Sequence, residues 1–410
     1  MTAPKLRFSE FKDEWIKTRI GESFQLISGF AFPSSAKSNS DGAKWLKIAD
    51  VGIQKMNPSN PSFLPKQYLQ TYSNFIVKKD DYVVALTRPI LNGELKISQV
   101  GDFYDNALLN QRVAKLASED NNLKFIYCLL QKSETVKDIE NSIAGTDPPN
   151  LSLNEIKDIT ISLPTVEEQT KIAEFLSVVD DKISQLSRQL ELLNQYKKGV
   201  MQKIFSQEIR FKNDNGEDFG EWEKVKFSDI FIEIKDKVGN KNIETYSITA
   251  GKGFVSQSEK FGRDISGSQN ENYIVLGKND FSYNKGNSKT YKFGCVYLNN
   301  TGQNIAVPNV FISFRAKKNN IAHNFYAKLF EHHYLDRYLR QLISSSARMD
   351  GLLNISKEGF FEIPLPFPPI PEQEKIAEFL TAIDEQIDHT TAQLTHTKHW
   401  KKGLLQQMFV

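Results

Sequence analysis

The tetrapeptide Asp-Pro-Pro-Asn at 147–150 has side chains that could act on a nucleobase. In a loop of the pattern Asp-Pro-Pro-aromatic, the acidic side chain and a proline carbonyl can hold the amino group of an adenine while the aromatic ring stacks on the flipped base. Here the fourth position is Asn150, whose amide offers no stacking face. Ser152 and Glu155, which follow, have the spacing of a helix capping box. We therefore interpret the segment as a turn.

No other set of residues has the spacing of a catalytic or metal site. The sequence contains no Gly-x-x-x-x-Gly-Lys, no His-Glu-x-x-His and no Gly-x-Ser-x-Gly. Cys128 and Cys295 are isolated, which favours a reducing compartment over a disulfide framework. His332 and His333 are adjacent, and neighbouring side chains of a helix point about 100° apart, so we expect no shared metal ion. The sequence thus predicts no catalytic residue, no metal and no bound cofactor.

Basic, amide and aromatic side chains alternate in several glycine-bearing stretches that could contact nucleic acid. Lysine and arginine suit phosphates, asparagine can bond to adenine, and tyrosine can stack on a base or donate to it. Ordinary solvated hairpins carry the same residues, so each stretch alone allows both interpretations. One such stretch in each half of the chain favours nucleic acid. The candidates are Lys44, Lys47, Thr87, Arg88, Asn92, Lys96, Lys252, Tyr283, Asn284, Lys285, Asn287, Lys289, Tyr291 and Lys292.

The 410 residues carry a net charge of only +2, but the charge is unevenly distributed. Residues 1–150 carry 19 Lys and Arg against 17 Asp and Glu, and residues 209–354 carry 21 against 16. Residues 151–208 carry 7 against 9, and residues 355–410 carry 5 against 8. A polyanion should therefore meet the first and third segments. Because no run approaches about 18 apolar residues and no secretory signal is evident, we expect a cytoplasmic location.

An internal repeat divides the sequence into two halves. The stretch EEQTKIAEFLSVVDDKI at 167–183 returns as PEQEKIAEFLTAIDEQI at 371–387. Residues 168–205 match 372–409 at 17 of 38 positions without a gap. The segments LRF…FKDEWIKTRIGESF and IRF…FGEWEKVKFSDIF, which precede the two globular stretches, are also alike. Of the Asp-Pro-Pro-Asn tetrapeptide only the asparagine recurs, as Asn354, and this favours the turn.

Apolar residues recur at alternating spacings of four and three in both copies of the repeat, which is typical of a coiled-coil seam. Thr165 and Glu168 have capping-box spacing, and Pro371 suits a first helical turn. Lys197 and Lys401 occupy equivalent seam positions, where a lysine weakens the seam but penalises slipped registers. Alternatively, they frame a fraying helix end. The predicted seam residues are Ile172, Leu176, Val179, Ile183, Leu186, Leu190, Leu193, Ile376, Leu380, Ile383, Ile387, Leu394 and Leu404.

Short β-branched or aromatic runs such as DYVVAL and VFISFRA, bounded by Gly, Asn and Pro, predict β-rich globular blocks with short helices. We therefore predict an α+β fold with two duplicated β-rich domains, at 1–150 and 209–354. Two long helices, within 151–208 and 355–410, separate these domains. The duplication predicts that the helices form an antiparallel coiled coil with pseudo-twofold symmetry.

The duplicated EQxKIAEFL helices, each entered through a proline-rich strand and followed by KKG, resemble the specificity subunit of type I restriction–modification systems. LRFSEFKDEW, FGEWEKVKFSDIF, NQRVAKL at 110–116 and TAGKGFVSQSEKFGRD at 249–264 are also similar to members of that family. The resemblance covers essentially the whole chain.

The resemblance implies a non-catalytic subunit that binds double-stranded DNA. Two target-recognition domains would each read one half of a bipartite, asymmetric sequence, and the helices would set the gap. The implied partners are two modification (methyltransferase) subunits, which bind S-adenosylmethionine and methylate adenine. Restriction subunits, the translocase and endonuclease, would join them and use ATP and Mg²⁺. Two alternatives stay open: an adenine methyltransferase, opposed by Asn150 and by the missing Phe-x-Gly-x-Gly cofactor loop, and a coiled-coil scaffold without duplex affinity.

Overall fold

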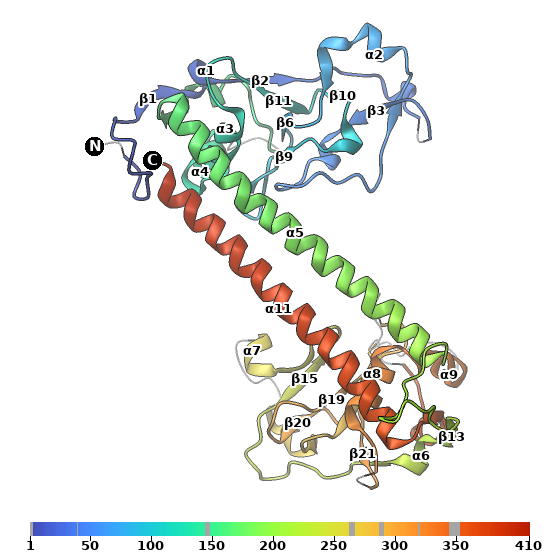
Figure 1. The fold of residues 1–410 in the computed structure, drawn as a ribbon. Coiled ribbons are helices and arrows are strands. Elements are labelled where there is room, and N and C mark those ends of the chain that lie inside the picture. Colours follow the sequence, from blue (N-terminus) through green and yellow to red (C-terminus); the bar gives the residue numbers. More distant parts are fainter. Residues whose placement is uncertain are drawn as a thin grey trace. The chain divides into compact units, whose positions relative to one another are not determined.

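The structure is a computed structural model, drawn as a ribbon in Figure 1. The chain divides into two compact units, of which the first contains Met1–Arg188 and Thr391–Val410 and the second contains Gln189–Thr390. Each unit therefore combines one globular block with parts of both long helices. The residues that the structure describes are 3–38, 40–143, 148–261, 267–286, 291–318, 320–343 and 353–410.

The first unit contains two four-stranded sheets and two strand pairs. One sheet is antiparallel and consists, in order, of β2 (Gln25–Ser28), β11 (Val113–Ala117), β6 (Tyr82–Ala85) and β9 (Ile97–Gln99). The other is mixed and consists of β4 (Phe63–Leu64), β3 (Ala43–Leu46), β10 (Ala107–Leu109) and β5 (Ile76–Val77). The pairs are β1 (Ile16–Arg19) with β12 (Thr160–Leu163), and β7 (Ile90–Leu91) with β8 (Glu94–Leu95). Its short helices are α1 (Ile20–Ser23), α2 (Tyr68–Thr71), α3 (Leu123–Leu129) and α4 (Ser133–Ser142).

The described residues of the second unit form one four-stranded sheet and three strand pairs. The antiparallel sheet consists, in order, of β14 (Phe231–Glu233), β21 (Ile312–Ala316), β18 (Phe281–Asn284) and β19 (Cys295–Leu298). The pairs are β13 (Glu223–Lys226) with β22 (Pro364–Phe367), β15 (Tyr246–Thr249) with β16 (Gly253–Ser256), and β17 (Ile274–Leu276) with β20 (Ile305–Val307). Its short helices are α6 (Phe227–Ile230), α7 (Gln257–Phe261), α8 (His323–Glu331), α9 (Asp336–Leu342) and α10 (Lys357–Phe361).

The two units share a topology that their sequences barely reveal. Numbered along the chain within each central sheet, the strand order is 1-4-2-3 in both units. In both, the strand that enters the block pairs antiparallel with the strand that leaves it, β1 with β12 and β13 with β22. These exit strands close each block immediately before its long helix. The domain boundaries proposed at 150 and 354 stay a prediction, and β12 and β22 follow them in sequence.

The long helices are α5 (Val166–Phe205) and α11 (Ile370–Met408). In the first unit Ile172 and Leu176 of α5 share a core with Leu404 of α11, and in the second unit Ile204 of α5 shares one with Ile376 of α11. The beginning of each helix therefore packs against the end of the other, which makes the pair antiparallel (Figure 1). All the predicted seam residues are buried or half-buried. The predicted α+β class with an antiparallel helix pair is confirmed.

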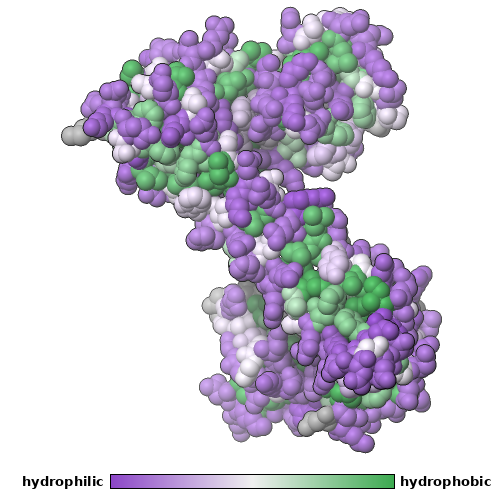
Figure 2. Space-filling model, viewed as in Figure 1, coloured by the Kyte–Doolittle hydropathy of each residue, from purple (hydrophilic) through white to green (hydrophobic). Residues whose placement is uncertain are grey.

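Apolar side chains also occur on the outer faces of these helices. Val178, Leu192, Tyr196 and Trp400 lie off the seam and are 67%, 47%, 54% and 49% exposed. On the face drawn in Figure 2, hydrophobic residues show in small groups among mostly hydrophilic ones. Within the described part of the chain, no helix is long and apolar enough to cross a membrane.

The repeated Glu-Gln at the start of each long helix anchors the helix to its globular block. Glu168 is 1% exposed, and its carboxylate accepts from Arg7 at 2.8 and 2.7 Å. Glu372 is equally buried and accepts from Arg210 at 3.1 and 2.8 Å. In both units a tryptophan indole also donates to this carboxylate. Since Thr165 Oγ1 accepts from Glu168 N at 3.4 Å, half of the predicted capping box forms, but the glutamate side chain has a different role.

The glutamine that follows holds a second element of each unit. Gln169 Oε1 accepts from Asn122 N at 3.0 Å, and Gln373 Oε1 accepts from Ala322 N at 3.0 Å. Asn122 and Ala322 are the residues that precede α3 and α8, where backbone amides lack helical partners. The repeat EQxKIAEFL therefore encodes two long-range attachments as well as a seam.

The seam lysines form an ion-pair cluster in each unit, in which Lys401 is buried and Lys197 is half-buried. Lys401 Nζ of α11 lies 2.7 Å from Asp180 Oδ1 of α5, and Lys124 Nζ lies 2.7 Å from Asp180 Oδ2. Lys197 of α5 pairs with Asp384 of α11 at 2.5 Å in the same manner. An ion pair across the seam favours one register of the helices. The structure therefore supports the register interpretation of these lysines over the fraying helix end.

In the second unit the corresponding cluster is richer in carboxylates. Lys328, the counterpart of Lys124, pairs with Asp384, and Glu331 also pairs with Lys197. Burial alone would lower the pKa of Lys197, but its hydrogen bonds to Asp384 and Glu331 outweigh burial and raise the pKa. Lys197 is therefore charged at neutral pH, as the cluster requires.

Candidate nucleic-acid interface

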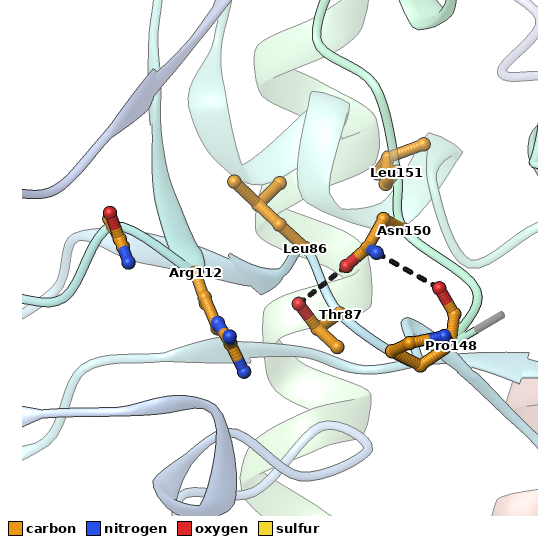
Figure 3. Close-up of a pocket in the computed structure, with 7 residues that line it drawn as sticks. Leu86, Thr87, Arg112, Pro148, Asn150 and Leu151 are labelled. Carbon is orange, nitrogen blue, oxygen red and sulfur yellow. Dashed lines mark hydrogen bonds between the residues drawn. The ribbon is translucent and has the colours of Figure 1, made fainter. Parts of the chain in front are cut away.

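Three segments of the first unit meet beside the central sheet (Figure 3). Residues 86–88 follow β6, residues 110–112 precede β11, and residues 148–151 lead toward β12. The backbone N–H of Leu86 donates to the carbonyl of Arg112 at 2.9 Å, so the first two segments continue the pairing of β6 with β11. The same ladder fixes their positions relative to one another.

Asn150 fastens the third segment to the first. Its Oδ1 accepts from Thr87 Oγ1 at 2.7 Å, and its Nδ2 donates to the Pro148 carbonyl at 2.9 Å (Figure 3). The backbone N–H of Arg88 donates to the Pro149 carbonyl at 2.7 Å. Asn150 therefore holds the loop in place, at the position where an adenine-binding loop carries an aromatic ring. The turn interpretation agrees with this geometry, although Asp147 itself lies outside the described residues.

The second unit repeats this docking. The backbone N–H of Leu353 donates to the Lys285 carbonyl at 3.0 Å, just after β18. Ser152 Oγ accepts from Glu155 N at 3.4 Å, which is one half of the predicted second capping box, and Ser356 caps α10 in the second unit. The serine of this segment thus has the same role in both halves, since it accepts from the backbone N–H three residues later.

A cavity of about 390 Å³ lies where the three segments of the first unit meet. Thr87 and Asn150 in its wall are bonded to each other, whereas Gln111 and Arg112 make no side-chain hydrogen bond or ion pair with other described residues. Asn110 Oδ1 accepts from Arg112 N at 3.0 Å and fixes the backbone there. The lining residues are Leu86, Thr87, Gln111, Arg112, Pro148, Asn150 and Leu151.

Gln111 and Arg112 are absent from the candidates that the sequence indicated. They belong to NQRVAKL at 110–116, which lacks the glycine and aromatic residues of the other stretches. A usable signal was an amide and an arginine immediately before the apolar strand β11.

Three lysines of the first unit have partners within the protein. Lys44 Nζ lies 4.9 Å from the centre of the Phe103 ring, and Lys47 Nζ donates to Ser62 Oγ at 2.5 Å. Lys96 is half-buried and donates to a backbone carbonyl at 3.3 Å, and burial lowers its pKa. Lys44 and Lys47 are also half-buried, so none of the three side chains is fully presented to solvent.

Asn92 has a conformational role. Asn92 and Gly93 have φ values of 54° and 74° and form the two-residue connection between β7 and β8. Positive φ at both positions is what a type I′ hairpin turn requires. Its side chain is exposed at the hairpin tip. Arg88 is also exposed and has a φ of 47°, which is uncommon for an arginine.

The structure corrects the prediction for Tyr283. Its side chain is 0% exposed, its hydroxyl donates to the Phe293 carbonyl at 2.7 Å, and its ring stacks on Phe360 with centroids 5.0 Å apart. Burial raises its pKa. Tyr283 belongs to the core because β18 lies between β21 and β19, so it cannot contact a ligand. Next to it, Asn284 Nδ2 donates to the Ile248 carbonyl at 3.3 Å, and Asn284 Oδ1 accepts from Gly286 N at 2.8 Å.

The other candidates of the second unit differ in exposure. Lys252 lies at the exposed tip of the β15–β16 hairpin, and Lys292 is also exposed. Lys285 is half-buried with its ammonium 3.5 Å from a backbone carbonyl, and the Tyr291 ring lies 5.2 Å from the ring of His333. The candidates Asn287 and Lys289 lie outside the described residues.

The thiols and the adjacent histidines have separate environments. Burial raises the pKa of Cys128 and of Cys295 to about 11, so both thiols are protonated at neutral pH.

A hydrogen bond to Asp336 at 3.2 Å raises the pKa of His333, whereas burial lowers the pKa of His332. Among the residues that the structure describes, no group of three His, Cys, Asp or Glu residues could hold a metal ion.

The fold and the site define a class of protein: a duplicated α+β chain whose two sheet-based units carry exposed basic loops and share a pair of long helices. Residues 12–195 and 220–397 both match the family model described as the type I restriction modification DNA specificity domain. The chain belongs to this family.

Relatives and solved structures agree with this assignment. The specificity subunit of the type I restriction enzyme MjaVIII from Methanocaldococcus jannaschii is 33% identical over 213 residues, which cover 52% of this chain and 50% of that protein. The EcoAI specificity subunit from Escherichia coli is 26% identical over 176 residues, 42% of this chain and 29% of that one. The chain thus spans half or less of the length of these relatives.

The crystal structure of the S subunit of a type I restriction–modification system from M. genitalium superimposes with a TM-score of 0.60. The superposition covers 100% of this chain and 99% of that one, at 17% sequence identity. This likeness shows that the two chains share the fold.

Proposed function

We propose that this chain is the DNA-specificity subunit of a type I restriction–modification complex and has no catalytic activity of its own. Each globular unit reads one half of a bipartite, asymmetric target in double-stranded DNA, and the long helices set the gap between the halves. The observation that carries this proposal is the family match to both halves of the chain, over 12–195 and 220–397. The equal sheet order and the equal docked segment of the two units support it.

The docked loop of the first unit argues against methyl transfer by this chain. Asn150 offers no stacking face for a flipped adenine, and both ends of its amide are bonded, to Thr87 Oγ1 and to the Pro148 carbonyl. We therefore assign S-adenosylmethionine to two modification subunits, and ATP and Mg²⁺ to restriction subunits. On this proposal the chain itself binds no cofactor.

The outer faces of the long helices suit the docking of those subunits. Leu192 and Tyr196 lie one turn apart on α5, and Trp400 lies on α11, all about half exposed and off the seam. Aromatic residues are enriched at protein interfaces and contribute most of their binding energy. The complex would act in the cytoplasm, where its DNA substrate lies.

Adenine-methylation mapping tests the proposal. Genomic DNA is compared between cells that express this chain with its cognate modification subunit and cells that express the modification subunit alone. A split, asymmetric methylated motif that appears only with this chain is the expected result. Replacement of residues 209–354 by the corresponding block of another family member should then change one half of the motif and leave the other half unchanged.

Two outcomes would overturn the proposal. Stoichiometric binding of S-adenosylmethionine by the purified chain would make it a methyltransferase. A chain that binds no duplex DNA, alone or with the modification subunit, would be a protein scaffold. Phosphate contacts make log affinity fall linearly with log salt concentration, so a steep salt dependence separates DNA binding from the scaffold.

A further inference from the structure

Arg88 and Arg112 differ from the paired arginines of the first unit. Arg7 pairs with Glu168, and Arg19 pairs with Asp158 at 3.3 Å. Both Arg88 and Arg112 are exposed, and neither forms an ion pair with a carboxylate among the described residues. Two arginines without acidic partners therefore lie within the three-segment site described above.

The backbone that carries Arg112 is rigid. Its carbonyl accepts from Leu86 N at 2.9 Å, its N–H donates to Asn110 Oδ1 at 3.0 Å, and β11 begins at the next residue. Arg112 lies immediately before a strand of the central sheet, and side chains held by such elements are positioned more precisely than those on free loops. In Figure 3 Arg112 lies on one side of Thr87, opposite Pro148 and Asn150.

Among the described lining residues, the unused hydrogen-bonding capacity is concentrated in two side chains. Thr87 donates to Asn150 and the Asn150 amide is used at both ends, so these groups have little left for a ligand. Arg112 and Gln111 keep their side-chain donors for a ligand. Among the described residues that line the cavity, Arg112 is also the one that is charged, and Arg88 adds a second positive charge immediately after Thr87.

These donors suit the oxygens of a phosphate. The planar guanidinium fork forms two parallel hydrogen bonds to phosphate oxygens, and the amide of Gln111 can donate a third. Most contacts of proteins with DNA go to the phosphates and sugars, and they set position without reading sequence. A cavity whose described lining carries a cation and few other unused polar groups fits that role.

We propose that Arg112, with Gln111, is an anchor for one DNA backbone phosphate in the first unit, and that Arg88 strengthens its positive field. The anchor contributes affinity and register and does not read sequence. This proposal rests on the proposed function, since it names a contact of the first unit with its half of the target.

The test uses the complex of this chain with its cognate modification subunit and two fluorescent duplexes of equal length. One duplex carries the mapped motif and the other a scrambled sequence. Affinity is measured across a series of salt concentrations for the wild-type chain, Arg112→Gln and Arg112→Lys. The matched control is Lys137→Gln, which removes an exposed positive charge from α4 on the same unit. Thermal unfolding checks that each variant folds.

The expected result for Arg112→Gln is a loss of about tenfold on both duplexes, as hydrogen bonds to a charged group predict. The slope of log affinity against log salt should fall by about 1. Arg112→Lys should keep most of the slope because it keeps the charge, with a smaller loss of affinity. Lys137→Gln should match the wild type in both quantities.

Three outcomes would overturn the anchor. Relaxation of one base position of the methylated motif in Arg112→Gln, with scrambled-duplex affinity unchanged, would make Arg112 a base reader. An unchanged slope and affinity would remove Arg112 from the interface. A wild-type complex that binds neither duplex would refute the proposed function, and the anchor with it. The first two outcomes leave the specificity role intact, so the two failures are distinguishable.

Discussion

Replacing Asp180 with alanine should leave two lysines of the first unit without their common carboxylate. Asp180 of α5 lies 2.7 Å from both Lys401 of α11 and Lys124 of α3. The Lys401 side chain is only 4% exposed, so water cannot replace the lost partner. The change therefore leaves a buried charge in the helix pair and should destabilise the first unit.

The expected magnitude follows from the burial of the three groups. Removing one partner of a buried ion pair costs about 3–5 kcal/mol. Asp180 is 25% exposed, and Gln54 and Gln131 still accept from Lys401 at 2.7 and 3.3 Å, so we expect the lower end, about 3 kcal/mol. For a unit of this size about 1 kcal/mol shifts Tm by about 2–4 °C, which predicts a fall of about 6–12 °C.

Differential scanning calorimetry of the full chain measures this shift, and Asp384→Ala is the matched control. In the second unit Lys197 and Lys328 keep Glu331 as a partner when Asp384 is removed. We therefore expect Asp384→Ala to lower stability by about half as much. Adding Lys401→Met to the Asp180→Ala chain should recover stability, since it removes the stranded charge.

Two results would refute this reasoning. A fall in Tm below about 2 °C for Asp180→Ala would mean that Lys401 reaches water or another acceptor. Equal falls for Asp180→Ala and Asp384→Ala would mean that Glu331 does not compensate. Either result would contradict this account of how the two clusters stabilise the helix pair.

Three further predictions test other parts of the structure. Glu168→Gln weakens the charge-assisted pair with Arg7 and should lower the free energy of unfolding by about 1.5–3 kcal/mol in urea titrations. Tyr283→Phe removes one buried hydrogen bond, so it should cost about 1 kcal/mol while duplex affinity in binding titrations stays unchanged. Because Asp336 raises the pKa of His333 above 6.5, the charged pair stabilises the folded chain below pH 6.5, and this contribution is lost as the pH rises through the raised pKa. Asp336→Asn should remove that pH dependence in thermal unfolding scans.

The helices were predictable because their signal is local and periodic. Apolar residues at alternating spacings from Ile172 to Ile204, and again from Ile376 to Met408, fix both the helical period and the seam. The repeat itself then predicted the duplication and the antiparallel pairing. This part of the fold could be predicted from one sequence because its pattern is local and occurs twice.

The long-range contacts were not predictable in this way. Glu168 has the local spacing of a capping residue, but its carboxylate binds Arg7, a residue 161 positions away in sequence. An ion pair with a buried charge outweighs a solvated capping bond, and no pattern in the local sequence indicates this long-range pair. The duplicated Arg210–Glu372 pair was the available signal, because arginine and glutamate recur in both halves.

The candidate site was predicted least well, for two physical reasons. Tyr283 stands among Asn and Lys, which suggests an exposed loop, but its strand is flanked by strands on both sides and is buried. Arg112 stands next to an apolar strand, which suggests a core, but it lies at the strand's solvent-facing start. The exposure of a residue at a strand end depends on the order of the strands in the sheet, and local sequence patterns do not indicate that order.

The first unit is assembled from two stretches of chain with the whole second unit between them. Phe409 packs against Trp15 and Phe125 at centroid separations of 6.3 and 5.0 Å, and Leu6 N donates to Gln407 O at 2.8 Å. During synthesis on the ribosome, the first globular block therefore cannot complete its hydrophobic core until the end of α11 has been translated. The second unit, translated in the meantime, already has all its parts once Thr390 is made. A premature stop codon in the part of α11 after Thr390 would thus remove residues from the core of the first unit and leave the second unit whole.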